Sequence, residues 1–342
     1  MFNVSFLHAG GGDSIFVTYL DNKNIHRNIL IDGGTGKVYQ NALKDIVEKI
    51  DQLDLVIVTH IDLDHIGGIN KLLESKHSKK IKKIYFNSAD LIKKTNSSMI
   101  SISDGIKLTE FIQEQGIEIF NDNIVEDEEF NENGLSIKFL SPTIEALYHL
   151  NNSWTQYEEE QSLISSTFTN DTRLLSEIAK DKFEEKSLTK DVANWSSLAF
   201  IISYEGVSIL LLGDAKDSVL VKSLKSNKYT SVNRCQVDYV KVSHHGSKYN
   251  TSIDFLSLIE SNNFIFSTNG THNHPDIETI ARIICHPERD YCKKINLYFN
   301  YPKSEYEQKN VRLPTQEEEA EFNFQSIYDF KILELGRINC GR

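Results

Sequence analysis

The 342-residue sequence has little cysteine and no long apolar run. Its four cysteines are too few and too scattered to build the disulfide framework of a small secreted protein. The most apolar stretch, Leu198–Leu212, is interrupted by a glutamate and a glycine and is too short to cross a bilayer. These shortages exclude a disulfide scaffold and a transmembrane helix. They also favour a reducing compartment.

A basic N-terminal head and an excess of positive charge are missing as well. The opening residues, MFNVSFLHAGGGD, contain no apolar run behind a basic head, so we see no signal peptide and expect a cytoplasmic location without membrane attachment. The net charge of −12 argues against a general nucleic-acid coat protein, because phosphate binding depends on clustered Lys and Arg. Eight lysines between Lys71 and Lys94 are the exception, and they form either a solvated surface or a phosphate-facing rim.

Short β-branched runs alternate with helical patterns along most of the chain. The expected strands are Phe2–Leu7, Ser14–Leu20, Asn28–Asp32, Asp54–His60, Ile81–Phe86, Ser136–Leu140, Leu198–Tyr204, Val207–Leu212, Asp238–Val242 and Phe264–Ser267. The expected helices are Val38–Ile50, Ile69–Ser75 after a Gly-Gly turn, Asp104–Gln115, Asp217–Lys225 and Ile277–Cys285. The tail, Lys294–Leu335, is typical of two or three strands at a sheet edge.

Residues 141–192 differ from the rest because they are polar, acidic and helix-prone, without a strand pattern. Strand patterns resume on both sides. We therefore interpret this segment as a helical acidic insertion into one domain made of residues 1–140 and 193–342. A lid, a dimer contact and a surface for a protein partner all agree with its composition.

The strongest chemical signal is HIDLDH, residues 60–65. A buried strand is expected to end just before it and to deliver two imidazoles and two carboxylates within six residues. Side chains alternate at a strand end, so His60, Asp62 and Asp64 can point to one side, and we expect His65 to turn in with the following glycines. Such groups are costly to bury unpaired, which makes a metal ion their natural partner.

Two further strands end in residues that bind metals. Asp214 follows the run VSILLLG, and His244 follows DYVKVS. If these strands are neighbours in a sandwich of two sheets, their ends meet His60 at one rim. Of the adjacent His244 and His245 we prefer His244 as the ligand, because it directly follows the strand.

Residues 60–65 resemble the metal motif of metallo-β-lactamase fold hydrolases, whose usual pattern is His-x-His-x-Asp-His. Asp62 stands in place of the second histidine. This substitution resembles the ComEC-type branch of the family, which is the hydrolase domain of a DNA-uptake protein. The further motifs that resemble this branch, in the same order, are Asp13 in GGGDS, Asp32-Gly33-Gly34, Asn194-Trp195-Ser196-Ser197, Leu212-Gly213-Asp214, Ser243-His244-His245-Gly246-Ser247 and His274-Pro275. The resemblance spans roughly residues 1–285 apart from the insertion. It implies an α+β fold, the four-layer αββα metallo-β-lactamase sandwich.

The resemblance also implies a divalent metal site with one or two ions. Its ligands would be His60, Asp62, Asp64, His65, Asp214 and one of His244 and His245. Zn²⁺ and Mn²⁺ are the main candidates and Mg²⁺ a third, because a carboxylate in place of an imidazole hardens the site. Asn194–Ser197 falls where the family often has a further histidine, so one of the two positions could be weak or empty.

The implied activity is metal-dependent hydrolysis, by hydroxide generated at the metal, of a phosphodiester in DNA or another nucleotide. Asp214 would bridge the ions, and His274 would hydrogen-bond or protonate the leaving oxygen, although a turn residue before Pro275 is an equal reading. The expected catalytic residues are Asp64, Asp214 and His274. The expected substrate contacts are Asp13, Asn194, Ser247 and Lys248.

Two other functions stay open. One is hydrolysis of a carboxyl ester, lactone or thioester, against which the missing second motif histidine counts. The other is a non-catalytic, partner-binding component of a multi-protein, defence-type system, which would bind a protein through residues 141–192. The costly cluster of Asp64, His65, Asp214 and His244 counts against that function.

Overall fold

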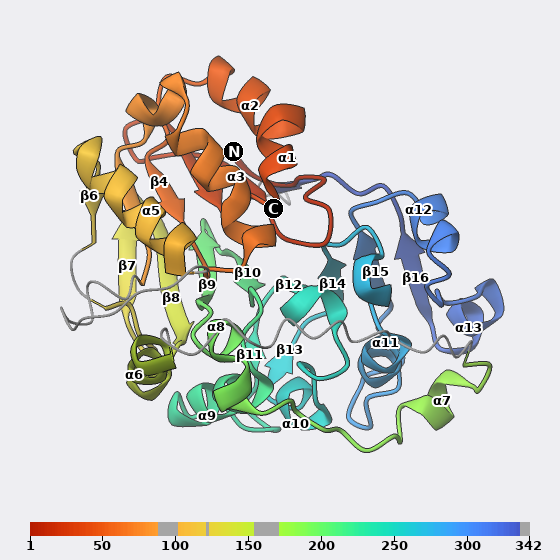
Figure 1. Ribbon diagram of the computed structural model, residues 1–342. Coiled ribbons are helices and arrows are strands. Elements are labelled where there is room, and N and C mark those ends of the chain that lie inside the picture. Colours follow the sequence, from red (N-terminus) through yellow and green to blue (C-terminus); the bar gives the residue numbers. More distant parts are fainter. Residues whose placement is uncertain (88–101, 121–122, 154–170, 336–342) are drawn as a thin grey trace.

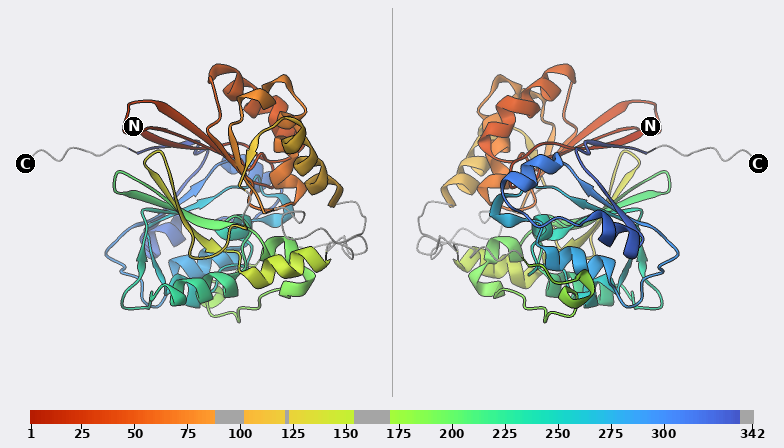
Figure 2. Two further views of the ribbon diagram at one scale, coloured as in Figure 1. Left: turned by 90° about the vertical axis from the view of Figure 1, so that its left-hand side faces the viewer. Right: turned by 90° about the vertical axis from the view of Figure 1, so that its right-hand side faces the viewer.

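The computed structural model of the chain describes residues 1–87, 102–120, 123–153 and 171–335. Two large β-sheets lie face to face, and helices cover both outer faces (Figures 1 and 2). The expected four-layer α/β sandwich is confirmed.

The first sheet has the strand order β17-β1-β2-β3-β4-β5-β6. Its strands are β1 (Phe2–Phe6), β2 (Ile15–Leu20), β3 (His26–Ile31), β4 (Leu55–Ile57), β5 (Lys83–Tyr85), β6 (Glu118–Ile119) and β17 (Ile332–Leu335). β1, β2 and β3 form the expected antiparallel meander, and β3 to β6 continue in parallel. The whole of β4 is buried, as its continuous apolar run predicts.

The second sheet has the order β16-β15-β14-β12-β10-β9-β8-β7. Its strands are β7 (Glu129–Glu132), β8 (Leu135–Ser141), β9 (Ala199–Tyr204), β10 (Val207–Leu211), β12 (Tyr239–Lys241), β14 (Asn263–Phe266), β15 (Ile295–Phe299) and β16 (Phe324–Ile327). β10, β12, β14, β15 and β16 run parallel. A separate parallel pair is formed by β11 (Cys235–Gln236) and β13 (Ile259–Glu260).

Helices fill the two outer layers. The first sheet is covered by α1 (Gly36–Val38), the π-helix η1 (Tyr39–Leu43), α2 (Lys44–Lys49), α3 (Leu63–Leu73) and α5 (Ile102–Glu114), with the 3₁₀ helix η2 (Lys76–Lys80) nearby. The second sheet is covered by α7 (Leu175–Ile178), α9 (Asp217–Ser226), α10 (Ile253–Leu256) and α11 (Ile277–Ile284). The remaining helices are α6 (Ile144–Ser153), η3 (Leu188–Lys190), α8 (Val192–Trp195), η4 (Ser243–Gly246), η5 (Thr271–Asn273), α12 (Lys303–Gln308) and α13 (Gln316–Glu321).

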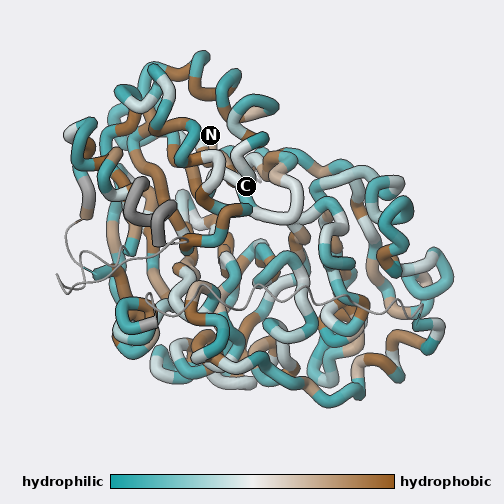
Figure 3. The backbone as a smooth tube through the Cα atoms, viewed as in Figure 1, coloured by the Kyte–Doolittle hydropathy of each residue, from teal (hydrophilic) through white to brown (hydrophobic). Residues whose placement is uncertain are grey.

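Apolar side chains form three large clusters that match the layers. The central cluster joins the sheets, for example Val4, Val17 and Ile57 from the first and Phe200 and Leu211 from the second. The other two lie between each sheet and its helices. Hydrophobic residues accordingly recur along the strands and alternate with hydrophilic ones along the outer helices (Figure 3).

Helix α3 corrects one expectation from the sequence. We expected the helix to be Ile69–Ser75 after a glycine turn, but it spans Leu63–Leu73 and contains both Gly67 and Gly68. A Cβ atom on Gly68 would lie 2.0 Å from the carbonyl oxygen of Gly33. The two glycines therefore permit close packing of the helix on the loop after β3, and that packing outweighs their low helix propensity.

The described parts of residues 141–192 contain α6, α7, η3 and the start of α8, and no strand beyond the end of β8. The tail forms three strands that belong to different sheets. β15 and β16 lie at one edge of the second sheet, and β17 lies at an edge of the first. Cys235, Cys285 and Cys292 are free thiols, and Cys340 lies outside the described residues. Among the described helices, none is both long and apolar enough to cross a membrane.

Candidate metal centre

The candidate site lies where the two sheets meet at the carboxyl ends of four strands. β10, β12 and β14 are parallel neighbours in the second sheet, and the loops after them carry Asp214, His244-His245 and His274. β4 belongs to the first sheet and leads to His60 and the start of α3. The strand ends therefore converge across the sandwich, and only three of the four strands are neighbours in one sheet.

Asp214 stands at the centre of four imidazole rings. The Nε2 atom of His65 lies 3.5 Å from Oδ1 of Asp214. The Nε2 atoms of His244 and His245 each lie 3.6 Å from Oδ2, and that of His60 lies 3.9 Å from the same oxygen. The carboxylate that the sequence predicts as a bridge is thus within reach of every predicted histidine ligand.

Hydrogen bonds at Nδ1 determine which nitrogen of three of these rings carries the proton. Nδ1 of His65 donates to Asp32 Oδ2 at 2.8 Å, and Nδ1 of His245 donates to the carbonyl oxygen of Ser267 at 2.9 Å. The Thr59 hydroxyl donates to Asp32 Oδ2, so its oxygen accepts from Nδ1 of His60 at 3.0 Å. In the neutral rings the lone pairs are therefore on the Nε2 atoms that face Asp214.

These three Nε2 atoms, of His60, His65 and His245, are buried and have no hydrogen-bond partner, and the same is true of Asp214 Oδ1. A buried polar atom without a partner costs about 1–3 kcal/mol, so this arrangement is unfavourable unless a cation binds. Imidazole nitrogens held by a second hydrogen bond at Nδ1 are the usual ligands of zinc and related metals. The residues present fit a divalent metal ion.

Among the described residues, four groups of three ligand atoms lie within 4.8 Å of one another, and two of these groups do not include Asp13. One consists of His60, His65 and Asp214, and the other of Asp64, His65 and His245. Asp62 Oδ2 lies 3.5 Å from His60 Nε2. The Asp62 and Asp64 side chains are 36% and 40% exposed, so both carboxylates open the site towards solvent.

The charges in the cluster shift the protonation of its members. Burial by itself would raise the pKa of the Asp214 carboxyl, but His245, His244 and His65 outweigh it and hold that pKa well below its usual range. Burial likewise opposes protonation of His65, yet Asp214 and Asp32 raise the pKa of its imidazole. The Asp214 carboxylate is therefore ionised and able to accept a cation.

His244 and His245 take different positions although they are adjacent. Both have left-handed backbone conformations, with φ of 47° and 56°, which turns both rings towards Asp214. His245 has its Nδ1 fixed and belongs to a ligand group, whereas Nδ1 of His244 has no hydrogen-bond partner. The His244 ring lies 5.7 Å from that of His274, and burial lowers its pKa to about 4. The structure thus favours His245 as a ligand, where the sequence favoured His244.

The four expected substrate contacts do not share one environment. Asp13, Asn194 and Ser247 are buried, and Asp13 forms an ion pair with Lys241 beneath the site. Only Lys248 of the four has an accessible side chain, and its Nζ lies 2.9 Å from Glu278 Oε1. The other three side chains are buried within the protein, so they are placed to support neighbouring residues and not to contact a substrate.

His274 lies at the edge of the histidine cluster, and its Nδ1 is 3.4 Å from Asp276 Oδ2.

Several lysines between Lys71 and Lys94 already have partners within the protein. Lys71 pairs with Glu74, and Lys83 pairs with Glu132. Lys93 and Lys94 lie outside the described residues, so no lysine rim is assigned to the site.

Sequence reasoning missed the residues that support the ligands. They are Asp32, Thr59, Ser197, Lys241 and Ser267. The Asp-Gly-Gly motif after β3 was a visible signal for Asp32, and the Asn/Ser motif was one for Ser197, whose Oγ accepts from the backbone N–H of Asp214 at 3.1 Å. A lysine within a strand and a backbone carbonyl have no such signal.

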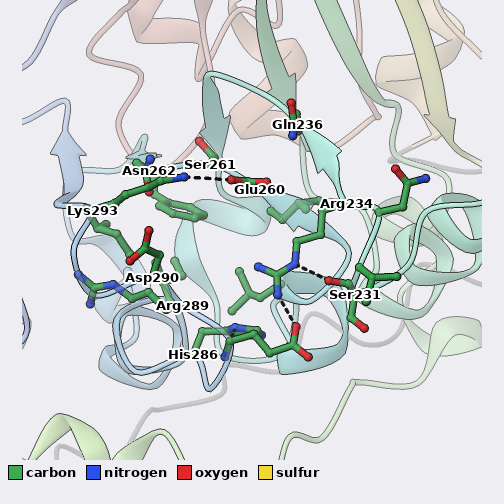
Figure 4. A pocket seen from close by; sticks show the side chains of 18 residues that line it. Ser231, Arg234, Gln236, Glu260, Ser261, Asn262, His286, Arg289, Asp290 and Lys293 are labelled. Carbon is green, nitrogen blue, oxygen red and sulfur yellow. Dashed lines mark hydrogen bonds and ion pairs between the residues drawn. The ribbon is translucent and has the colours of Figure 1, made fainter.

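A separate cavity of about 360 Å³ lies beside β11 and β13, at the opposite ends of β14 and β15 (Figure 4). Its charged side chains are matched within the protein. Arg234 pairs with Glu288, Lys293 lies 3.3 Å from Glu260, and Arg289 donates to backbone carbonyl oxygens. The unsatisfied ligand atoms are at the metal centre, so the candidate activity is assigned there.

The model of the Metallo-beta-lactamase superfamily matches residues 10–143. Among solved structures the chain is similar to the metallo-beta-lactamase fold protein YhfI from Bacillus subtilis, with 12% identity and a TM-score of 0.40. It is also similar to Zn²⁺-bound PqqB from Methylobacterium extorquens, with 13% identity and a TM-score of 0.47. Both alignments cover 98% of this chain and 100% of the other. A search of curated proteins gave no match.

The matched residues run from the glycine-rich loop after β1 to the end of β8 and include residues 60–65. The loops that carry Asp214, His244-His245 and His274 follow β10, β12 and β14, which lie in the second sheet beyond the match. Residues 10–143 thus match the model of the Metallo-beta-lactamase superfamily, and the chain has the α/β sandwich fold of that superfamily.

Proposed function

We propose that this protein is a metal-dependent phosphodiesterase that acts on a nucleic acid or another nucleotide. The observation that carries the proposal is the ring of Nε2 atoms around Asp214, three of them with Nδ1 fixed by hydrogen bonds and Nε2 unsatisfied. Such a cluster is costly to maintain in a protein that binds no metal.

Two overlapping ligand sets would hold the metal. His60, His65 and Asp214 would form one, with Asp62 beside His60, and Asp64, His65 and His245 would form the other. When bound, divalent cations lower the pKa of water to roughly 7 and neutralise charge on a phosphoryl oxygen.

The chain's own residues support a phosphodiester over a carboxyl derivative. The carboxylates of Asp62 and Asp64 are hard donors, which tilt the site towards Mn²⁺ or Mg²⁺ as well as Zn²⁺. The Asp at position 62 is also the feature that resembles the ComEC-type branch. His244 lies beside Asp214 and its ring is 5.7 Å from that of His274, so these two imidazoles are positioned to move a proton to or from a leaving oxygen.

Turnover of bis(p-nitrophenyl) phosphate, single- and double-stranded DNA and RNA, with Mn²⁺, Mg²⁺ or Zn²⁺, tests the proposal. We expect metal-dependent cleavage by the wild type and at least a 100-fold loss in Asp214→Asn. Asp329→Asn, which changes a half-exposed carboxylate at the surface, serves as the matched control and should retain wild-type activity. Hydrolysis of p-nitrophenyl acetate or a lactone without any phosphodiester cleavage would replace the proposal with a carboxyl-ester hydrolase.

A further inference from the structure

We propose that Lys241 and Asp13 act as positioning residues that hold Asp214 and His245 in place for metal binding. The inference rests on the metal centre of the proposed function but does not depend on which substrate is cleaved. Neither residue is itself one of the proposed ligands.

The Lys241 side chain is completely buried, and the Asp13 side chain is 2% exposed. Lys241 Nζ forms an ion pair with Asp13 Oδ2. Removing two charges from water costs several kcal/mol for each ion, and a buried ion pair is often no more stable than apolar residues of similar volume. A pair of this kind directly below a metal centre therefore calls for a role other than stability.

The contacts of Lys241 reach the bridging aspartate. Nζ donates to the carbonyl oxygen of Gly213 at 3.1 Å, the residue just before Asp214. The same carbonyl oxygen accepts from the backbone N–H of His244 at 2.9 Å. One ammonium group thus links the end of β12 to the loop after β10 and restrains both loops that supply ligands.

The second carboxylate oxygen of Asp13 lies close to the His245 ring. This atom, Oδ1, lies 3.8 Å from Nδ1 of His245 and has no hydrogen-bond partner. This oxygen places negative charge beside the ring, on the side that donates to the Ser267 carbonyl. Negative charge there favours the proton on Nδ1 and leaves Nε2 free to bind a metal.

The glycine-rich loop explains how Asp13 comes so close. A Cβ atom on Gly12 would lie only 1.7 Å from the carbonyl oxygen of Asp64. The backbone next to Asp13 therefore packs directly on the first turn of α3, a position that only glycine permits. The ion pair then connects this loop, through Lys241, to the second sheet.

The test compares Lys241→Met, Asp13→Asn and the double variant with the wild type. Lys83→Met is the matched control, since it breaks a lysine–carboxylate pair elsewhere in the sandwich. The readouts are Co²⁺ affinity by chelator competition, the visible absorption spectrum of bound Co²⁺, and thermal unfolding. None of them depends on turnover.

We expect Lys241→Met and Asp13→Asn to weaken Co²⁺ binding by 10- to 100-fold and to change its spectrum, as loss of an outer partner typically does. Each single variant leaves a buried charge alone and should also unfold at a lower temperature. The double variant should regain thermal stability but not Co²⁺ affinity. The control should bind Co²⁺ like the wild type.

A double variant that folds and binds Co²⁺ with wild-type affinity and spectrum would overturn the proposal and leave the pair a purely structural role. A wild type that binds Co²⁺ normally but cleaves no phosphodiester would overturn the proposed function alone. A wild type that binds no Co²⁺ would overturn both.

Discussion

The buried carboxylate of Asp32 accepts a hydrogen bond from Nδ1 of His65 at 2.8 Å. The same carboxylate accepts from the backbone N–H and the hydroxyl of Thr59, next to His60. Asp32 therefore orients His65 directly and His60 through Thr59, although it is not itself one of the proposed ligands. This arrangement of a carboxylate behind a metal-binding imidazole is known to raise the ligand's basicity and fix its orientation.

Replacing Asp32 with Asn places an amide that can also donate where only an acceptor fits. We expect Asp32→Asn to weaken metal binding by about 10- to 100-fold, because His65 loses its charged acceptor. Competition with a chelator of known affinity measures the effect. Asp51→Asn, at an exposed position, is the control. Equal affinities of Asp32→Asn and wild type would show that the hydrogen bond does not support the ligand.

The close packing of α3 predicts a strong effect of a single methyl group. Gly68→Ala would place a Cβ atom 2.0 Å from Gly33 O, and we expect a loss of at least about 2 kcal/mol in the free energy of unfolding. Gly36→Ala is the matched control, because the nearest atoms to its Cβ would be 3.7 Å away. Urea denaturation of both variants measures their free energies of unfolding. Similar midpoints for the two would contradict the packing role of Gly68.

His244 and His245 should separate metal binding from turnover. We expect His245→Ala to lose most of its metal affinity, since Nε2 of His245 is an oriented, unsatisfied ligand atom. His244→Ala should keep metal affinity within a few-fold and lose turnover by about 10²–10⁴, the usual contribution of a proton-transfer group. Metal content per chain and turnover of bis(p-nitrophenyl) phosphate test the pair. The opposite order would restore His244 as the ligand that the strand pattern favours.

Asp217, at the start of α9, predicts a pH-dependent stability away from the ligands. Burial, aided by Glu185 and Asp254, raises the pKa of its carboxyl to about 6 from 3.8, although Ser252 N–H donates to it at 2.7 Å. The folded state therefore binds this proton more tightly than the unfolded state. The stability that it contributes is complete below pH 4 and is lost as pH rises through 6, by up to about 3 kcal/mol.

Asp217→Asn removes this titration. We expect the variant to be more stable than the wild type at pH 8 and the difference to shrink towards pH 5. Urea midpoints of both proteins at the two pH values measure it. A difference that does not change with pH would mean that Asp217 is ionised in the folded protein at both.

Most of the strands could be predicted, because period and β-branched composition are local properties. β4, β10 and β12 lie where their apolar runs predict, and each is followed by ligand-type residues. β7 is an exception. Glu129–Glu132 belongs to an acidic run without a strand pattern, and it forms a strand because it pairs with β8 at the sheet edge. Pairing of this kind depends on the partner strand and not on the segment itself.

The sequence by itself determined the chemistry of the site, since the spacing of His60, Asp64 and His65 after a buried strand is a covalent property of the chain. Only the tertiary structure decided which nitrogen of each ring faces the metal position, because Asp32 and the Ser267 carbonyl come from other strands. It also gives His244 and His245 different surroundings, through a left-handed turn that strand periodicity does not encode. The burial of Lys241 beside Asp13 joins residues 228 positions apart in the sequence, and only packing of the two sheets could bring them together.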